Sequence, residues 1–219
     1  MASSAIESHG TRRVRVSRLL LATAVAALGA ACATPAPKGP LLLHPVPPTA
    51  EKYSLSQGAI VFAGPDFTVS ARPWDYRLVA EEFRRSGEPS PFGDDEAAVG
   101  RFLFFRVRLE NASKGTLVFN PMRVSLLRAN EAPLAPLENS DIFMFTGDDP
   151  VAADARGRAF RRVCFDTTAT IRPGQSIERY LVFRAPEEPT KKVMLVIDDL
   201  WLGSTSFTLE FPFEAFPGK

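Results

Sequence analysis

The sequence contains very little histidine and cysteine, with two residues of each among 219. His9 lies near the N-terminus and His44 lies in a proline-rich stretch, so the long C-terminal part of the chain has no histidine. Serine or cysteine nucleophiles activated by histidine are therefore excluded there, as are zinc and copper sites built on imidazole. The glycines are isolated and form no phosphate-binding loop. We therefore expect no cofactor, no metal and no enzymatic activity.

Long apolar runs are also lacking. The apolar run at residues 19–28 is shorter than the roughly 20 residues that a membrane-spanning helix needs. Four arginines lie before this run, between Arg12 and Arg18, and small residues lead from it to Cys32. A basic head, a short apolar segment and a small-residue cleavage site are typical of a secretory signal peptide. We therefore expect residues 1–31 to be removed on export.

The end of this segment resembles the signal of bacterial lipoproteins, in which a cysteine becomes the lipid-modified N-terminus. Ala31 and Cys32 match that pattern. Gly29 stands where lipoproteins carry Leu, Val or Ile, and Leu28 lies one position earlier. The resemblance implies that Cys32 is the lipidated residue. The alternative is an ordinary signal cut after Ala31 or Ala33, which would release a soluble protein.

Two further details concern export and sorting. Arg12 and Arg13 allow the twin-arginine route as well as the Sec route, although Arg15 stands where the twin-arginine motif has an apolar residue. Ala33, rather than aspartate, follows Cys32. By resemblance to enterobacterial lipoproteins, this implies a bacterial outer-membrane protein held through the lipid on Cys32. Its folded part would lie in the periplasm or at the cell surface.

The 188 residues after the predicted signal fit one domain and a linker. Residues 32–50 contain Cys32 and six prolines, a composition that favours extended polyproline II structure. We therefore expect a tether there and a folded domain at residues 51–219. Four of the 26 basic and one of the 25 acidic residues precede Cys32, which leaves a formal charge of −2. Without a basic excess, binding to nucleic acid is not expected.

Alternation with a period of two dominates the predicted domain. In residues 101–110, apolar side chains alternate with Phe104 and charged residues, which is typical of a half-buried strand. The residues that we expect to be buried are Leu103, Phe105, Val107, Leu109, Phe207, Leu209 and Phe211. Further strands are expected at residues 59–63, 67–71, 122–128, 161–171, 177–184 and 192–198. Residues 74–85 instead have the spacing of a short helix. Many short strands separated by turns indicate an all-β sandwich.

Two motifs in this region carry a family resemblance. One is Asn111-Ala112-Ser113 directly after a strand, and the other is Pro173-Gly174 before a strand that ends in phenylalanine. Together they resemble the telokin-like, immunoglobulin-like domains of uncharacterised bacterial lipoproteins. The resemblance implies an immunoglobulin-like β-sandwich of about seven to nine strands in the cell envelope. It transfers no functional residue.

Few residues remain as candidates for chemistry. Cys164 lies in an apolar context without a histidine, so we interpret it as a small buried hydrophobe. Acidic clusters at residues 94–96 and 148–149 are interpreted as solvated loop charge. Asp198, Asp199 and Trp201 lie near a predicted strand end, where loops often carry function. We treat these three residues as a candidate ligand-binding corner.

Two classes of function are consistent with these features. The first is a non-enzymatic envelope lipoprotein whose sandwich binds a partner protein or supports envelope assembly. The second is a carbohydrate-binding module or a glycan hydrolase, which would use two carboxylates about 5–10 Å apart. The two classes differ in whether an acidic pair converges in a cleft.

Overall fold

The computed structural model describes residues 40–46, 49–93, 95–129, 131–145, 149–186 and 190–218. The predicted signal peptide, Cys32 and the first part of the predicted tether lie outside these residues, as do Asp94 and Asp148 of the acidic clusters. Within the described ranges, no helix combines the length and the apolar character that crossing a membrane requires.

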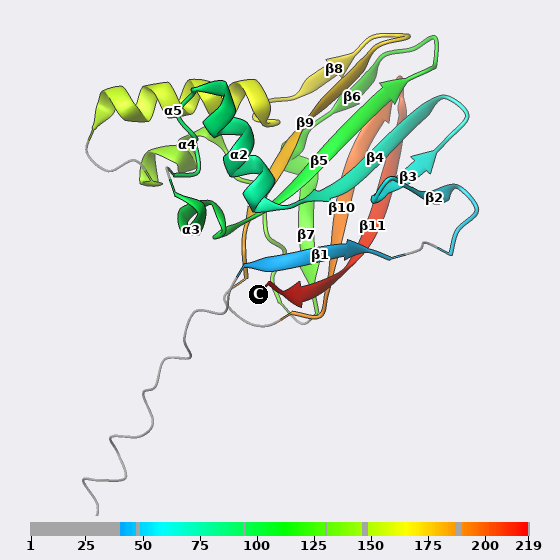
Figure 1. Ribbon diagram of the computed structural model, residues 1–219. Coiled ribbons are helices and arrows are strands. Elements are labelled where there is room, and N and C mark those ends of the chain that lie inside the picture. Colours follow the sequence, from blue (N-terminus) through cyan, green and yellow to red (C-terminus); the bar gives the residue numbers. More distant parts are fainter. Residues whose placement is uncertain are drawn as a thin grey trace, which may run out of the picture. The chain divides into compact units, whose positions relative to one another are not determined.

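Two antiparallel sheets form the body of the molecule (Figure 1). Sheet A has the order β1-β11-β10-β6-β8, and β7 also pairs with β10. Its strands are β1 (Leu41–Pro45), β6 (Leu117–Phe119), β7 (Val124–Arg128), β8 (Ala169–Ile171), β10 (Lys192–Leu202) and β11 (Thr205–Pro217). Sheet B has the order β2-β3-β4-β5-β9. Its strands are β2 (Tyr53–Ser56), β3 (Ala59–Ala63), β4 (Phe67–Trp74), β5 (Phe102–Asn111) and β9 (Ser176–Arg184).

A β-sandwich was expected, and this coarse architecture is confirmed, with eleven strands in the described residues instead of seven to nine. The alternation of apolar residues produces it, because each strand turns one face inward. Buried side chains from both sheets form one apolar cluster. Leu103, Phe105, Val107 and Leu109 are each at most 3% exposed, as predicted. Leu209 and Phe211 are also buried, whereas Phe207 is only partly buried.

Helices add a layer that the sequence pattern did not predict in full. They are α2 (Tyr76–Ser86), α3 (Glu96–Val99), α4 (Asn139–Ile142) and α5 (Pro150–Val163), with 3-10 turns η1 (Pro121–Arg123) and η2 (Phe143–Phe145). Figure 1 shows α2–α5 gathered at one side of the sandwich, beside β5 and β9. A second apolar cluster lies between these helices and the outer face of sheet B. Phe104 was placed on the face opposite the apolar residues, and an outward position for it is wrong, because the helices bury its side chain together with that of Tyr180 on β9.

The predicted helix near residues 74–85 is confirmed as α2. Asp75 accepts a hydrogen bond from the Arg77 N–H at 2.8 Å, which caps the first turn. Gly87 ends the helix with φ of +70°, a conformation that favours glycine. The α2 side chain of Glu82 also ties the helix to sheet B, because it accepts a hydrogen bond from the Tyr180 hydroxyl at 2.6 Å. Burial and this bond raise the pKa of Tyr180.

The predicted strand at residues 161–171 is largely wrong. Its first three residues are the last turn of α5, and only β8, Ala169–Ile171, is a strand. Asp149 caps α5 and Pro150 occupies its first position, where proline is tolerated. The predicted strand at 122–128 also begins late, because Met122 lies in η1 and is 51% exposed.

The predicted boundary between tether and domain at residue 51 also needs correction. Leu41–Pro45 forms β1, which pairs with β11 from Leu41 opposite Pro217 to Pro45 opposite Phe213. Leu41 and Leu43 pack against the sandwich core. Pro45 is compatible with this position because β1 is an edge strand, where a missing N–H is tolerated. The sandwich therefore includes residues that were assigned to the tether.

Candidate functional site

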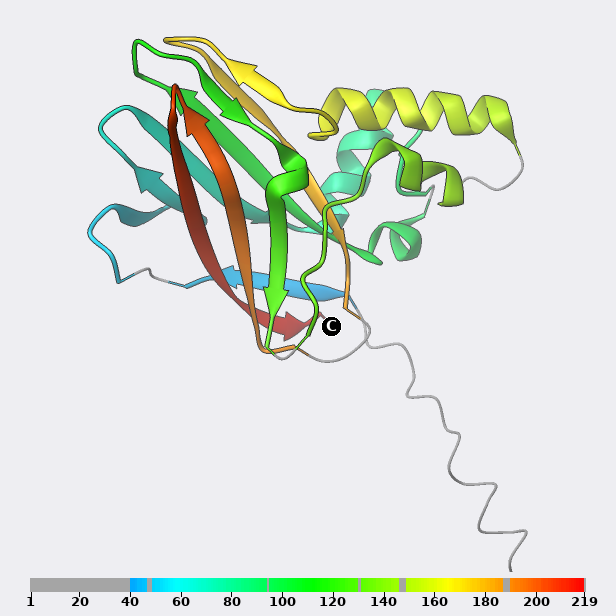
Figure 2. The ribbon, with the colours of Figure 1, turned by 180° about the vertical axis from the view of Figure 1, so that it is seen from behind.

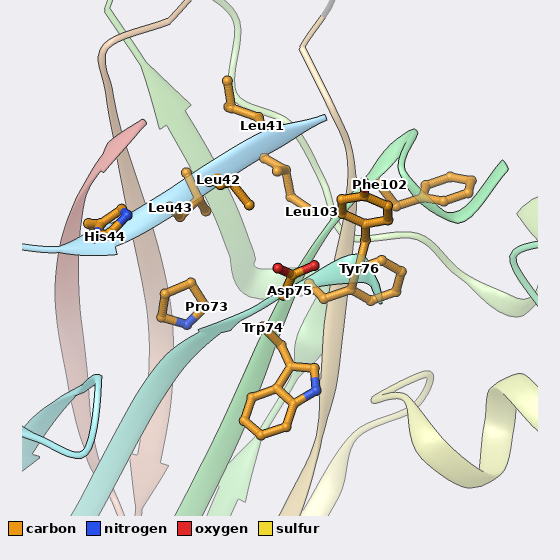
Figure 3. A pocket seen from close by; sticks show the side chains of 11 residues that line it. Leu41, Leu42, Leu43, His44, Pro73, Trp74, Asp75, Tyr76, Phe102 and Leu103 are labelled. Atoms are coloured by element: carbon orange, nitrogen blue, oxygen red, sulfur yellow. The ribbon is translucent and has the colours of Figure 1, made fainter. Parts of the chain in front are cut away.

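A cavity of about 230 Å³ lies beside β1 (Figure 3). Its walls come from residues 41–44 of β1, residues 73–76 at the junction of β4 and α2, and residues 102–104 at the start of β5. In Figure 3 the Asp75 carboxylate points toward β1, whereas the Trp74 indole points away from it. Among the lining residues, Asp75 is the only carboxylate.

This carboxylate already has a structural role. Asp75 accepts the hydrogen bond that caps α2, and no second acid lines the cavity to act with it. His44 is exposed, and its ring meets Phe216 edge-on at 5.2 Å between centroids. The cavity therefore has one carboxylate, which caps a helix, and its geometry does not match a pair of catalytic acids.

The predicted corner at Asp198 and Asp199 is a β-bulge in β10. The register with β11 shifts between Ile197 and Leu200, and Asp199 has φ of +53°. The Thr208 hydroxyl donates a hydrogen bond to Asp198 Oδ1 at 2.6 Å. The bulge thus turns both carboxylates toward the outer side of sheet A and the side chains of β11.

Partners from other elements hold the two carboxylates. The Ser206 hydroxyl donates to Asp199 Oδ1 at 3.1 Å. Arg123 Nη2 lies 2.5 Å from Asp199 Oδ2 and 3.7 Å from Asp198 Oδ2. The pKa of Asp198 is lowered, chiefly by the Thr208 hydrogen bond, with Arg123 as a smaller cause. Both acids are therefore engaged in an internal network on the surface of the sandwich.

The third corner residue, Trp201, is 41% exposed and lies opposite Ser206 and Val118 in the sheet. The structure thus places all three predicted residues on one strand, but Arg123 was missed. Arg123 lies in the turn η1, which precedes β7, and no local sequence pattern connects Arg123 to β10. Thr208 and Ser206 could have been found, because they alternate with the apolar residues of β11 and so share its outer face.

The outer face of sheet A also carries a shallow apolar groove of about 430 Å³. Leu127 of β7 and Pro212 of β11 both lie opposite Met194 of β10, and Val46 completes the row beyond β11. Leu127 is 37% exposed. Figure 2 shows β7, β10 and β11 with none of α2–α5 lying over them. We call this surface, from Trp201 to Val46, the open face.

Cys164 is 1% exposed, which confirms its interpretation as a small buried residue. Burial raises the pKa of its thiol well above the usual range, and the nearby Asp166 carboxylate adds to the effect. A thiol in this state is a poor nucleophile. Across the described part of the chain, no group of three or more His, Cys, Asp or Glu side chains is placed to hold a metal ion.

Comparison with known proteins gives little further information. No protein-family model matches the sequence, and no curated protein matches it. Among solved structures, the chain is similar to the crystal structure of the YjhA protein from Bacillus subtilis. The two are 13% identical over 50% of this chain and 72% of that chain, with a TM-score of 0.33. At this TM-score the match is weak.

Proposed function

We propose that this chain is a non-enzymatic lipoprotein of the bacterial outer membrane, anchored through Cys32, whose sandwich binds a partner protein through the open face. The observation that carries the binding role is the contrast between the two outer faces. Helices bury part of the outer face of sheet B, whereas Leu127 and Trp201 of sheet A remain 37% and 41% exposed.

The composition of the open face supports a protein partner. Aromatic residues and methionine are enriched in protein interfaces, and here Trp201 and Met194 share a face with Leu127. The groove that Leu127 and Met194 line is shallow and mostly apolar, with Lys192 among its lining residues, and Trp201 lies further along β10. An apolar centre with a charged rim is the usual arrangement of such interfaces.

Contacts between the two resemblance motifs support an immunoglobulin-like type of sandwich. The Asn111 N–H donates to the Gln175 carbonyl at 3.0 Å, and the Gly174 N–H donates to the Asn111 carbonyl at 2.8 Å. The Asn111 side chain also donates to the Ile171 carbonyl at 2.8 Å. The two motifs therefore form one joint at the end of β5, although 60 residues separate them.

Asp198 and Asp199 are both held by hydrogen bonds and by Arg123, and this favours a binding protein over a glycan hydrolase. A hydrolase needs one carboxyl group with a raised pKa to act as general acid. Asp198 has a lowered pKa instead, and Arg123 lies against both acids.

The anchor is tested by replacing Cys32 with alanine. The wild-type protein should fractionate with membranes and carry an acyl mass on Cys32, whereas the variant should be soluble or uncleaved. Unchanged fractionation together with an unmodified Cys32 would contradict the anchor.

The binding face is tested separately by placing a photo-crosslinking amino acid at position 127 in intact cells. A matched control places it at the exposed position 84 of α2. We expect a discrete protein adduct from position 127 that disappears when Met194 is changed to glutamate. Equal adducts from both positions, or adducts to glycan alone, would refute the proposed face.

A further inference from the structure

Two arginines lie directly opposite each other on the exposed part of sheet B. Arg72 of β4 and Arg106 of β5 are register partners. Both guanidinium groups lie over the ring of Trp74, with their central carbons 4.5 Å and 5.1 Å from the ring centroid. We call Arg72, Arg106 and Trp74 the arginine platform. Like charges placed opposite each other on adjacent strands normally destabilise a sheet, so this arrangement needs a compensating charge.

The compensation within the chain is incomplete. Arg106 Nη2 lies 3.0 Å from Glu178 Oε2 on β9. Arg108, the next outward-facing arginine of β5, lies 2.5 Å from Glu110. Within the described part of the chain, the Arg72 guanidinium makes no ion pair and no hydrogen bond. The platform therefore has two positive charges against one carboxylate.

The Arg72 side chain is nevertheless held in place. Its guanidinium stacks on Trp74, and such cation–π contacts restrict a side chain that would otherwise move freely. The Trp74 ring packs against the cluster beneath the helices, and its Nε1 is buried without a hydrogen-bond partner among the described residues. Packing against the cluster thus holds the Trp74 ring in place, and the ring in turn restrains the guanidinium groups of Arg72 and Arg106.

The donors on this platform suit one class of ligand. A guanidinium presents a planar fork of N–H groups that matches the oxygens of carboxylates and phosphates. Arg106 already has a carboxylate beside it, because its Nη2 lies 3.0 Å from Glu178 Oε2. A singly charged oxyanion beside Arg72 would neutralise the remaining positive charge and satisfy donors that have no acceptor within the described chain.

We propose that the arginine platform is a binding site for the phosphate group of a phosphodiester. Arg72 supplies the principal contact, Arg106 the second positive charge, and Trp74 the surface that orients both. The phosphodiester is either a lipid headgroup or part of a soluble molecule. This site is on sheet B and is independent of the anchor and of the open face.

The test uses the full chain with Cys32→Ala, so that binding is not caused by the lipid, and with Trp201→Phe. Because the sequence has two tryptophans, Trp74 is then the only tryptophan reporter. Titration with dimethyl phosphate, with chloride at the same ionic strength as reference, should change its fluorescence in a saturable way. Arg72→Ala should raise the dissociation constant by about tenfold, equivalent to one charge-assisted hydrogen bond.

Controls separate a binding site from a merely structural stack. Arg108→Ala removes a neighbouring arginine of the same sheet face and should leave the titration unchanged. Arg72→Lys keeps the positive charge but lacks the planar N–H groups of a guanidinium, so it should bind more weakly than wild type. Circular dichroism melts confirm that each variant is folded. A saturable response to dimethyl phosphate that is equal in Arg72→Ala and Arg108→Ala would overturn the proposal.

Vesicles of phosphatidylcholine with and without phosphatidylglycerol identify the source of the phosphate. Binding to phosphatidylglycerol vesicles that depends on Arg72, with no response to dimethyl phosphate, indicates a lipid headgroup. An Arg72-dependent response to dimethyl phosphate without vesicle binding indicates a soluble phosphodiester. The absence of both responses in folded protein overturns the site.

Discussion

At the scale of single residues, Asn111 is the most informative side chain in the sandwich. It is 2% exposed, and all of its hydrogen-bonding capacity is used. Its Nδ2 donates to the carbonyls of Gly115 and Ile171, both at 2.8 Å, and its Oδ1 accepts from the backbone and hydroxyl of Ser113. One buried amide thus closes a turn and joins it to the strand β8 of the other sheet.

Replacing Asn111 with alanine should lower the free energy of unfolding by about 2–3 kcal/mol, because buried carbonyl groups lose their donors. Asn120→Ala is the matched control. Asn120 caps only the short turn η1, through one bond to the Met122 N–H at 3.0 Å, so we expect a loss of about 1 kcal/mol or less. Urea denaturation of the two variants measures both values. Similar losses in the two variants would show that the buried hydrogen bonds of Asn111 contribute no more to stability than the single capping bond of Asn120.

The thiol of Cys164 gives a second residue-scale prediction. Because burial raises its pKa, the reactive thiolate is scarce at neutral pH, and the side chain is also inaccessible. Iodoacetamide should therefore leave Cys164 unmodified in the folded protein and modify it fully in denaturant, as followed by mass spectrometry. Rapid alkylation under native conditions would mean that the α5–β8 segment opens readily.

At the scale of secondary-structure elements, β1 determines where the folded domain begins. Its backbone pairs with β11 along its whole length. Its side chains alternate between the core side, where Leu43 lies opposite the buried Ala215, and the other side, where Leu42 lies opposite the exposed Phe216. The strand therefore contributes both hydrogen bonds and apolar contacts to the edge of sheet A.

Leu43→Ser should destabilise the protein by about 1–2 kcal/mol, which corresponds to the loss of a partly buried leucine. Leu42→Ser keeps the strand and changes the other face, so its effect should be clearly smaller. Thermal melts of both variants test the alternation. If neither variant changes the melting temperature, residues 41–45 belong to the tether and not to the folded domain.

The elements also show which parts of the fold were predictable. Strands β5, β10 and β11 were identified because apolar and polar residues alternate along them or because both faces are apolar. Helix α5 was missed because it contacts its neighbours through Ala153, Gly157 and Ala159, with Phe160 as its one large buried residue. Small residues give a weak apolar pattern, and Gly157 and Pro150 suggest breaks. A Cβ at position 157 would lie 2.9 Å from Asn139 Oδ1, so a larger residue there would require the Asn139 side chain to shift.

The candidate sites were less predictable than the strands. The corner at Asp198 and Asp199 was recognised from its charge, but the sequence does not show that Arg123 reaches it from a separate turn. The arginine platform depends on the pairing of β4 with β5. Pairing between strands separated by two helices and a loop is a tertiary property, which local periodicity does not encode.

At the scale of the whole molecule, the core of the sandwich and the cluster beneath the helices share two strands, β5 and β9. Phe105 belongs to the core between the sheets, and its neighbour Phe104 belongs to the cluster beneath the helices. Tyr180 provides a further link through its hydrogen bond to α2. Because β5 contributes to both apolar clusters, we expect the two layers to unfold together.

This expectation is tested with Phe105→Ala, which should cost about 3–5 kcal/mol. Helical circular dichroism and near-ultraviolet signals should shift to the same lower denaturant concentration, as for a two-state transition. Arg108→Ala, on the exposed side of the same strand, should leave both curves nearly unchanged. If only the near-ultraviolet signal moves, the helices are an independent unit.

The position of β1 also determines how the domain would encounter other molecules. Nine peptide units separate Cys32 from Leu41, so with a lipid on Cys32 the sandwich would start within about 30 Å of the bilayer. A target in the same membrane patch would then experience an effective concentration on the order of millimolar. At that concentration, a contact too weak to survive dilution in a purified sample would be largely occupied in the cell. Affinity measured between detached partners would therefore understate how often they meet on the membrane.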